Sequence, residues 1–443
     1  MSGEFWQQPV DSGGIPVSGE QFDAIVVGAG PGGCSTAGHL AQQGKKVLLI
    51  DKAIFPRNKI CGDAVGGKSL SIVKSLGVKE RLEQTPHLRV TGIVFSSPNQ
   101  ARVRIPLPEE DVEKLEAGYV VPRIQFDWLL FERVQKLVRD AGGSIIQGGE
   151  VREIIHNEDE DKSAIGVGVR IGGREGEMRE FFAPWTVGSG GYQCPVMRNV
   201  LKEIHKEEIV DKKHYCASYR EYWTGIKGCP AKTGDIEIHL VDGINPGYFW
   251  IFPTGAEGEA NVGIGMVLTH LSKRKDKLKA MQSNIIANHP MFKERFAEAK
   301  IVEGSGAGWQ LPFGSPRKKA KLQPRRNFSN GVLLVGDAAS LVDPASGEGV
   351  GNALISGKIA AKHIVENRGG IEYQNELWGM LGGELTNSFG LQKMYQRTWL
   401  LNMLIKRAMK KPKIVELMAD SIASKEEQAK LHSKWYIFKT VFL

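Results

Sequence analysis

The chain has 443 residues, a formal net charge of +8, 41% hydrophobic residues and 24% charged residues. This is the composition of a soluble globular protein, and the length predicts two or three domains or one large domain with insertions. No stretch approaches the ~20 uncharged apolar residues of a membrane-spanning helix, and the first twenty residues hold neither Lys, Arg nor an apolar run, so we expect neither a transmembrane segment nor a secretory peptide. The five cysteines form no CxxC pair, which argues against a metal site or an iron–sulfur cluster and favours a reducing, cytoplasmic compartment.

A glycine-rich turn near the N-terminus predicts a dinucleotide-binding unit. An apolar run at 24–27 precedes the turn at 28–33, a small-residue helical pattern follows it, and a second apolar run at 47–50 leads to Asp51. In this arrangement Gly28 permits the tight bend, Gly30 lets a pyrophosphate approach the backbone, and Gly33 lets helix and strand pack closely. Asp51 is placed to accept hydrogen bonds from an adenosine ribose, and an acid there favours a free 2′-hydroxyl. The cofactor-binding residues predicted in this unit are Gly28, Gly30, Pro31, Gly33, Asp51 and Lys52.

The elements that follow alternate between helical and strand patterns. We predict a helix over 69–82, a hairpin from 90–95 and 101–106, and a helix over 125–141 that ends at two glycines. Then come a strand over 144–155, a second hairpin from 167–171 and 177–182, and a strand that closes on glycines at 188–191. The span 214–310 is rich in strand-type alternation, with a helix near 271–287, and predicts a separate sheet. A buried strand returns at 331–335, a helix follows over about 350–366, and residues 371–443 are helical by composition.

Two later segments extend the predicted cofactor site. Gly336 and Asp337 follow the buried strand, where a carboxylate is placed to accept hydrogen bonds from a ribityl chain. The turn at 347–349 opens a helix whose N-terminus would stabilise the negative charge of a reduced isoalloxazine at its N1–C2=O edge. Together with the first turn, these segments predict FAD as the cofactor, with the added contacts Gly336, Asp337, Gly347, Gly349 and Val350.

These pieces resemble the flavoprotein family of para-hydroxybenzoate hydroxylase over about residues 21–366. The resemblance implies a mixed α/β (α+β) fold with a Rossmann-like FAD-binding domain from 21–85, 120–200 and 328–370, an inserted antiparallel-sheet substrate domain from 86–119 and 201–327, and a C-terminal helical region over 371–443. It also implies that Arg123 contacts the flavin and that Val151 flanks the adenine. The chain departs from the family pattern at Gly190, where an aspartate tied to nicotinamide cofactor use is expected.

Two motifs narrow the resemblance to the geranylgeranyl reductase branch. One runs from Phe55 to Ala64 and contains Cys61-Gly62-Asp63, and the other matches the branch signature YxWxFP in full with Tyr248, Trp250, Phe252 and Pro253. The resemblance implies that these aromatic residues and Pro253 border a prenyl substrate and that Cys61 and Gly62 lie beside the flavin. It further implies that reduced FAD saturates isoprenoid double bonds. The candidate proton donors are Cys61, Asp63 and Tyr248.

The substrates that this branch implies are geranylgeranyl diphosphate, prenylated ether phospholipids, chlorophyll side chains or a menaquinone tail. Because the chain has one dinucleotide signature and no set of cluster ligands, we expect electrons from outside, through NADH or NADPH or a ferredoxin-like donor protein.

Three alternatives stay open: an FAD-dependent monooxygenase of an apolar substrate, a flavin halogenase, and a non-enzymatic carrier of prenyl groups. The YxWxFP signature argues against the first. A halogenase carries a lysine just before a Gly-Ile-x-Phe strand, and Val90 and Thr91 occupy those positions here. The intact glycine turn with Asp51 and Asp337 argues against the carrier.

A basic C-terminal stretch predicts peripheral contact with a membrane surface. Residues 385–415 contain no acid and seven Lys or Arg residues. Between these bases apolar residues recur at helical spacing, the pattern of a basic amphipathic helix that Pro412 would stop: Leu391, Met394, Tyr395, Trp399, Met403 and Leu404. Aromatic and aliphatic residues at 435–443 predict a second contact. The alternative is a helix packed on the flavin domain with a solvated basic face, and no module typical of nucleic-acid binding accompanies the bases.

Overall fold

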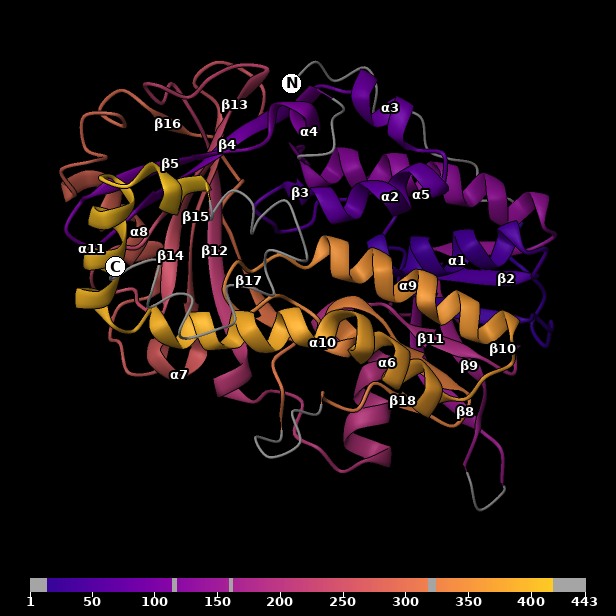
Figure 1. Cartoon of the computed structure of the whole chain (residues 1–443). Coiled ribbons are helices and arrows are strands. Elements are labelled where there is room, and N and C mark those ends of the chain that lie inside the picture. The colour runs from indigo at the N-terminus through magenta and orange to yellow at the C-terminus, as the bar shows by residue number, and fades with distance from the viewer. Residues whose placement is uncertain (1–13, 114–117, 159–161, 318–323, 417–443) are drawn as a thin grey trace.

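A computed structural model describes residues 14–113, 118–158, 162–317 and 324–416 of the chain (Figure 1). The predicted second membrane contact at 435–443 lies outside these residues. Two large sheets and one small sheet organise the described part of the chain. The expected mixed α/β fold with a helical C-terminal region is confirmed.

The first large sheet brings together segments that are far apart in the sequence. Its six strands lie in the order β18 (Phe328–Ser329), β19 (Val332–Leu334), β11 (Thr186–Gly188), β1 (Ala24–Val27), β2 (Val47–Asp51) and β7 (Ser144–Gln147). All pairs are parallel except β18 with β19. The strands β1 and β19 are buried along their whole length, as continuous apolar runs in a parallel sheet should be. The carboxyl ends of β1, β2, β11 and β19 therefore meet at one edge, where ligands bind in such folds.

Helices cover one side of this sheet (Figure 1). The helix α1 (Pro31–Gln42) packs against both α5 (Arg123–Asp140) and α9 (Val350–Val365). The predicted helix over 69–82 is instead two helices, α2 (Gly67–Ser75) and α3 (Lys79–Gln84). The interruption lies at Gly77, whose φ of +72° ends a helix.

A three-stranded antiparallel sheet is formed by β8 (Gly149–His156), β9 (Ala164–Ile171) and β10 (Glu177–Phe182). Its last two strands are the predicted second hairpin. The single strand predicted over 144–155 is wrong, because β7 and β8 belong to different sheets. They separate at Gly148, whose φ of +71° turns the chain between them.

The second large sheet has ten strands, all from the first three quarters of the chain. They are β3 (Ala64–Gly66), β4 (Leu88–Ser96), β5 (Arg102–Pro106), β6 (Gly118–Val120), β12 (Tyr215–Thr224), β13 (Thr233–His239), β14 (Gly247–Pro253), β15 (Ala260–Val267), β16 (Lys300–Ile301) and β17 (Ala307–Pro312). The predicted hairpin of β4 and β5 is confirmed. The sheet is not wholly antiparallel, since β13 pairs with β4 in parallel.

Short helices complete these parts of the chain. They are α4 (Glu109–Glu113), α6 (Pro195–Arg198), α7 (Leu268–Leu271) and α8 (Leu278–Asn288), a π-helical turn η2 (Asn199–Ile204), and the 3-10 turns η1 (Gly191–Gln193), η3 (Lys212–His214) and η4 (Gly336–Ala339).

The C-terminal region connects the two large sheets. From α9 the chain continues into the long helix α10 (Gly370–Met394), which leads to α11 (Thr398–Ala408) beside β5 (Figure 1). The single amphipathic helix predicted up to Pro412 is therefore wrong. It is interrupted at 395–397, where Arg397 has a non-helical ψ of 81°, and it ends at Ala408, before the proline.

Candidate cofactor and substrate cavity

The glycines of the first turn have different surroundings. Gly28 has a φ of +107°, and a Cβ there would lie 2.7 Å from the backbone of Ser189 and Gly190. A Cβ at Gly33 would lie 1.8 Å from the carbonyl oxygen of Gly28, so the start of α1 needs a glycine to pack on the turn. A Cβ at Gly30 would meet within 4 Å only the Arg57 guanidinium, at 3.5 Å. Gly28 and Gly33 are thus required by the backbone, whereas Gly30 borders open space.

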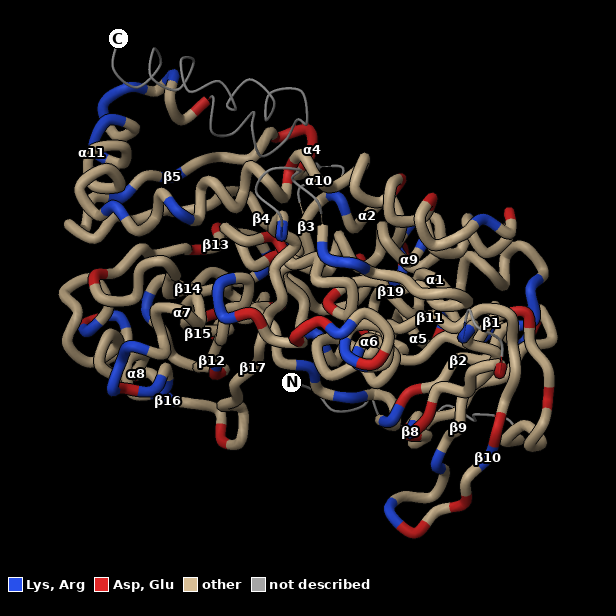
Figure 2. Tube along the Cα trace, turned by 90° about the horizontal axis from the view of Figure 1, so that it is seen from below, with Lys and Arg blue, Asp and Glu red and all other residues tan. Residues whose placement is uncertain are grey.

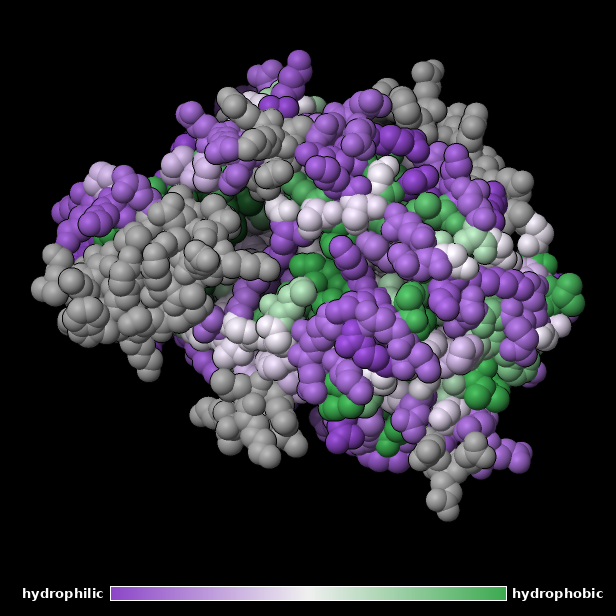
Figure 3. Space-filling view, turned by 45° about the vertical axis from the view of Figure 1, so that its right-hand side comes forward, coloured by the Kyte–Doolittle hydropathy of each residue, from purple (hydrophilic) through white to green (hydrophobic). Residues whose placement is uncertain are grey.

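That space is one cavity of about 1770 Å³ that runs between the two large sheets. Figure 3 shows a face of the molecule that is hollowed near its middle, where apolar side chains appear inside a mainly hydrophilic surface. The cavity is lined by most of the residues predicted to bind the cofactor: Gly28, Gly30, Pro31, Asp51, Lys52, Cys61, Gly62, Arg123, Val151, Gly336, Asp337, Gly347, Gly349 and Val350. Gly33, Asp63 and Pro253 do not line it. Chain segments separated by 300 residues therefore share one binding space.

Asp51 closes the turn as well as facing the cavity. One of its oxygens accepts a hydrogen bond from the backbone N–H of Ala29 at 2.7 Å, and the other accepts one from Ala53 at 2.9 Å. The carboxylate therefore links the end of β2 to the glycine turn after β1.

A buried ion cluster lies beside Gly30. Arg123, the first residue of α5, donates two hydrogen bonds to Asp127 at 2.7 and 2.9 Å, and Arg57 lies 3.1 Å from the same carboxylate. Burial raises the pKa of Asp127, but the two arginines outweigh it and hold that pKa below its usual value. Arg57 also lies over the Phe55 ring, 4.7 Å from its centroid. Arg57 belongs to the motif at 55–64 but was not predicted as a site residue, and its place beside Gly30 fits a diphosphate.

A lysine that was not predicted from the sequence also lines the cavity. The ammonium of Lys59 sits 3.5 Å from the centroid of the Trp309 ring. Burial lowers its pKa to about 7, opposed by the charge of Asp337. Its signal in the sequence was a basic residue two positions before Cys61.

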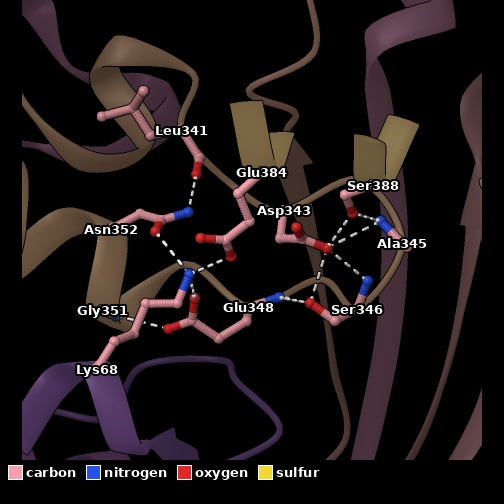
Figure 4. Close-up of polar contacts among 10 residues, drawn as sticks. All are labelled: Lys68, Leu341, Asp343, Ala345, Ser346, Glu348, Gly351, Asn352, Glu384 and Ser388. Carbon is pink, nitrogen blue, oxygen red and sulfur yellow. Dashed lines mark hydrogen bonds and ion pairs between the residues drawn. The ribbon is translucent and has the colours of Figure 1, made fainter. Parts of the chain in front are cut away.

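The loop before α9 is held in shape by Asp343 (Figure 4). One oxygen of this carboxylate accepts hydrogen bonds from the backbone N–H groups of Ala345 and Ser346, at 3.0 and 2.8 Å, and from the hydroxyls of Ser346 and Ser388, at 2.8 and 2.6 Å. Asp343 thus fixes the turn at 345–347 and ties it to α10.

Lys68 joins the end of this loop to two helices (Figure 4). Its ammonium, which comes from α2, pairs with Glu384 of α10, lies 3.9 Å from Glu348 and donates to the side-chain carbonyl of Asn352. Burial opposes the charged form, but the neighbouring carboxylates raise the pKa of Lys68 above its usual value. Glu348 in turn accepts the backbone N–H of Gly351 at 2.6 Å, in the first turn of α9.

The YxWxFP motif forms β14, and its alternation divides the strand into two faces. Tyr248, Trp250 and Phe252 line the cavity, whereas Phe249 and Ile251 are buried in the core on the other face of the sheet. The ring centroids of Tyr248 and Trp250 lie 5.9 Å apart, and those of Trp250 and Phe252 6.2 Å apart. Pro253 ends the strand and is buried away from the cavity, so of the motif's four matched residues only the aromatic three reach it.

The flavin-side motif meets this aromatic row at Gly62. A Cβ there would lie 3.1 Å from the Phe252 ring and 3.6 Å from the Trp250 indole nitrogen. Cys61 lines the cavity beside it. Asp63 is fully buried, and its carboxylate accepts the Tyr222 hydroxyl at 2.6 Å and the backbone N–H of Arg123 at 3.1 Å. Asp63 therefore anchors the loop and does not face the cavity.

Tyr248 faces the cavity, but its hydroxyl is occupied. It donates to the carbonyl oxygen of Ser346, and a Cβ at Gly347 would lie 3.0 Å from it. Burial raises the pKa of Tyr248, so the phenol stays protonated at neutral pH. β14 is thus bonded directly to the loop before α9.

The C-terminal helices close the cavity opposite the sheet. Of the residues expected to face a membrane, Leu391, Met394, Tyr395 and Leu404 line the cavity, together with Ile405 and Ile414. Trp399 is 64% exposed and points away from the core. Within the described residues, no helix is both long and apolar enough to cross a bilayer, and no group of His, Cys, Asp or Glu side chains is placed to hold a metal.

Comparisons with known proteins agree with this geometry. Residues 21–217 match the model of an FAD-binding domain, and residues 215–308 match that of a geranylgeranyl reductase catalytic domain. The chain is 32% identical over 354 residues to a digeranylgeranylglycerophospholipid reductase of Methanosarcina acetivorans, covering 78% of this chain and 75% of the relative. It is 29% identical over 353 residues to a menaquinone reductase of Mycobacterium tuberculosis, covering 77% and 76%.

The fold has a close counterpart among solved structures. A geranylgeranyl bacteriochlorophyll reductase-like protein from Thermoplasma acidophilum superposes with a TM-score of 0.71 at 19% identity, covering 95% of this chain and 98% of that one. The matched models, the relatives and a cavity that joins the glycine turn to the YxWxFP strand all lead to one assignment. The chain belongs to the geranylgeranyl reductase family and is an FAD-dependent reductase of isoprenoid chains.

Proposed function

We propose that this protein saturates the double bonds of a prenyl chain carried by a membrane lipid, such as the tail of a menaquinone or the chains of a geranylgeranylated phospholipid. The relatives named as menaquinone and digeranylgeranylglycerophospholipid reductases support this substrate class. The observation that carries it is the continuity of the cavity. Residues that fit FAD line one end, and apolar residues of β14, α10 and α11 line the other.

In this proposal the chain's own residues bind, orient and exclude water. Gly28, Gly30 and Arg57 are assigned to the diphosphate of FAD, Asp51 to its ribose, and Asp337 to its ribityl chain. Reduced FAD supplies the hydride when it is bound. Tyr248, Trp250 and Phe252 hold the alkene in an apolar environment from which water is excluded.

The proton is assigned to Cys61. Of the three candidates from the sequence, Asp63 is buried behind the loop, and the Tyr248 hydroxyl is bonded to a carbonyl. Cys61 lines the cavity next to Gly62, where the flavin-side loop meets the aromatic row. Lys59 is a second titratable group in the cavity, where burial lowers its pKa to about 7.

Electrons are assigned to an external donor, either NADH or NADPH or a ferredoxin-like protein. The test is the rate at which each donor bleaches the flavin absorbance without oxygen. A nicotinamide donor predicts bleaching by NADH or NADPH alone, and a protein donor predicts bleaching only when reduced ferredoxin is added.

The experiment that tests the main proposal is a chemical one. Purified protein is reduced without oxygen and offered a menaquinone, geranylgeranyl diphosphate or a digeranylgeranyl phospholipid in detergent. The expected product gains 2 Da for each bond reduced, and the flavin is reoxidised in step. A product that gains 16 Da only when oxygen is admitted would establish a monooxygenase instead, and a colourless protein that binds the lipid unchanged would establish a carrier.

We propose further that α11 and the residues at its two ends dock on a membrane surface. The exposed apolar side chains there are Trp399, in the first turn of α11, and Met409, just after the helix, at 64% and 57% exposure. Leu391, near the end of α10, is 41% exposed and also lines the cavity. Lys and Arg residues surround α11 (Figure 2). Because the inner face of the same two helices lines the cavity, a docked protein would place the cavity wall against the bilayer that holds the substrate.

A further inference from the structure

One buried asparagine joins the two motifs of the cavity. Asn261 lies on β15, opposite Tyr222 of β12 and Phe252 of β14, and is fully buried. Its side-chain nitrogen donates to the carbonyl oxygen of Cys61 at 2.7 Å and to the carboxylate of Asp63 at 2.8 Å. Its side-chain oxygen accepts the indole N–H of Trp250 at 3.0 Å.

The partners leave the amide one orientation. An indole nitrogen only donates, whereas a backbone carbonyl and a carboxylate without a proton only accept. Rotating the amide by half a turn would set Trp250 N–H against N–H and the two acceptors against an oxygen. Asn261 therefore holds three specific groups at once, with two donors and one acceptor of a single carboxamide.

The Trp250 ring is also held by contact with the neighbouring strand β15. A Cβ at Gly263, which lies opposite Trp250 in the sheet, would fall 2.1 Å from the indole ring. The ring thus lies flat across the backbone of β15, and Asn261, two residues before Gly263, binds its edge. Contact with Gly263 therefore fixes the tilt of the Trp250 ring, and the hydrogen bond to Asn261 fixes the position of the ring within its own plane.

The loop at the other end of the amide is under local constraint. Asp63 has a φ of +68°, which a non-glycine residue adopts only when its surroundings hold it. Asn261 and the Tyr222 hydroxyl hold it from two neighbouring strands. The position of Cys61 and Gly62 in the cavity therefore depends on the sheet that also presents Trp250.

We propose that Asn261 is a positioning residue for alkene reduction. Its carboxamide keeps the Trp250 indole and the loop at 61–63 in one fixed relation, so that a prenyl chain lying on the aromatic row stays at reacting distance from the flavin side of the cavity. The inference rests on the proposed function above and deepens it. Asn261 itself does not line the cavity and does not touch the substrate.

The first test measures the hydrogen-exchange protection of the two segments and not the reaction. Asn261→Leu keeps the number and branching of the side-chain heavy atoms and removes all three hydrogen bonds. Hydrogen exchange of the FAD-loaded protein should rise at least fivefold both in residues 58–66 and in 247–253. Asn327→Leu is the matched control, because Asn327 is equally buried but lies outside the cavity. It should leave exchange in both segments unchanged. A rise in only one of the two segments, or in neither, would overturn the proposal.

The second test reads the chemistry by a double-mutant cycle. Trp250→Phe removes the indole N–H and keeps an aromatic ring. With the flavin content unchanged, Asn261→Leu should slow reoxidation of the reduced flavin by the prenyl substrate at least tenfold, and adding Trp250→Phe should slow it less than twofold further. Affinity for the saturated product should change less than threefold, because the apolar wall remains.

Independent effects of the two substitutions that multiply would overturn the positioning role. So would an Asn261→Leu protein that turns over like the unchanged protein. If Asn261→Leu fails to fold, Asn261→Asp serves instead, since it keeps the acceptor for Trp250 and loses both donors. It should then release the loop at 58–66 and leave 247–253 protected. A failure of the proposed function is seen separately, because the unchanged protein would then reduce no prenyl chain while the exchange result would still stand.

Discussion

At the scale of single residues, the glycines of the first turn meet two different requirements, one of the backbone and one of a ligand. A side chain at Gly28 would overlap the backbone of Ser189 and Gly190, and one at Gly33 would overlap the backbone of Gly28, whereas one at Gly30 would enter the cavity beside Arg57. The same pattern of three glycines thus combines two folding requirements with one binding requirement.

We predict that Gly30→Val folds but is colourless, because a branched side chain would occupy the space assigned to the FAD diphosphate. The flavin absorbance of the purified protein and its far-UV circular dichroism measure the two properties. Gly33→Ala is the contrasting variant and should lose folded yield, since its Cβ would lie 1.8 Å from a carbonyl oxygen. Normal flavin content in Gly30→Val would remove the diphosphate assignment.

A second residue-scale prediction concerns the acid stability of the second large sheet. Glu237 is buried, which alone raises its pKa, but hydrogen bonds from His239 and two from Arg295 outweigh burial and lower that pKa from 4.5 to about 2. The ionised form therefore stabilises the fold above pH 4.5, and this contribution of roughly 3 kcal/mol is lost as the pH falls through about 2.

The comparison is between the unchanged protein and Glu237→Gln. Melting temperatures measured from pH 6 to pH 3 should fall less steeply for the glutamine variant, although its melting temperature at pH 6 should be lower. Parallel curves for the two proteins would show that Glu237 has an ordinary pKa.

At the scale of elements, α10 is attached to the loop before α9 by one stripe of polar side chains. Glu384 pairs with Lys68, Ser388 donates to Asp343 at 2.6 Å, and Gln392 donates to the carbonyl of Pro344 at 2.6 Å. The four-residue spacing puts all three on one helix face. The helix that closes the cavity is thus bonded to a loop assigned to the flavin.

We predict that Ser388→Ala and Gln392→Leu together loosen this loop. Each lost hydrogen bond contributes about 1 kcal/mol, so amide exchange at 343–349 should rise roughly tenfold or more and FAD affinity should fall by a similar or smaller factor. Asn375→Ala, on the same helix but exposed and away from the cavity, should change neither. A rise in amide exchange that is confined to α10 and leaves residues 343–349 unaffected would show that the stripe does not couple the helix to the loop.

At the scale of the whole molecule, charge and cavity meet at one end. Deleting residues 385–443 would remove Ser388 and Gln392 of the stripe and a cavity wall along with the bases, so the docking proposal needs surface substitutions. Each base near an anionic leaflet contributes about 1 kcal/mol, and the contribution is screened by salt.

We predict that replacing Lys406, Lys410 and Lys411 by Glu abolishes binding to vesicles with anionic lipid at low salt and that Trp399→Ser weakens it. The matched control replaces three exposed lysines of the α7–α8 connection, Lys273, Lys275 and Lys277, by Glu. It changes the net charge equally and should bind better than the α11 variant. Cosedimentation in low and high salt measures both, and equal loss in the two variants would reduce the effect to net charge.

The sequence by itself determined what depends on neighbouring residues. The glycine turn, the flanking apolar strands, the β4–β5 hairpin and the alternation of Tyr248, Trp250 and Phe252 each need only local spacing, and each lies where it was predicted. The interruptions at Gly77, Gly148 and Arg397 escaped prediction because apolar periodicity continues across them. At these three positions the element ends because the chain turns into another sheet or helix.

Only the tertiary structure decided which side chains meet. Asp63 looked like a cavity acid in sequence, but it is held behind the loop by Tyr222 and Asn261, which are about 160 and 200 residues away. The places of Arg57, Lys59 and Asn261 likewise follow from the register of strands and the packing of loops onto them. These side chains form hydrogen bonds and ion pairs with residues of distant segments. Their partners are therefore set by how distant strands align and not by the residues beside them in the chain.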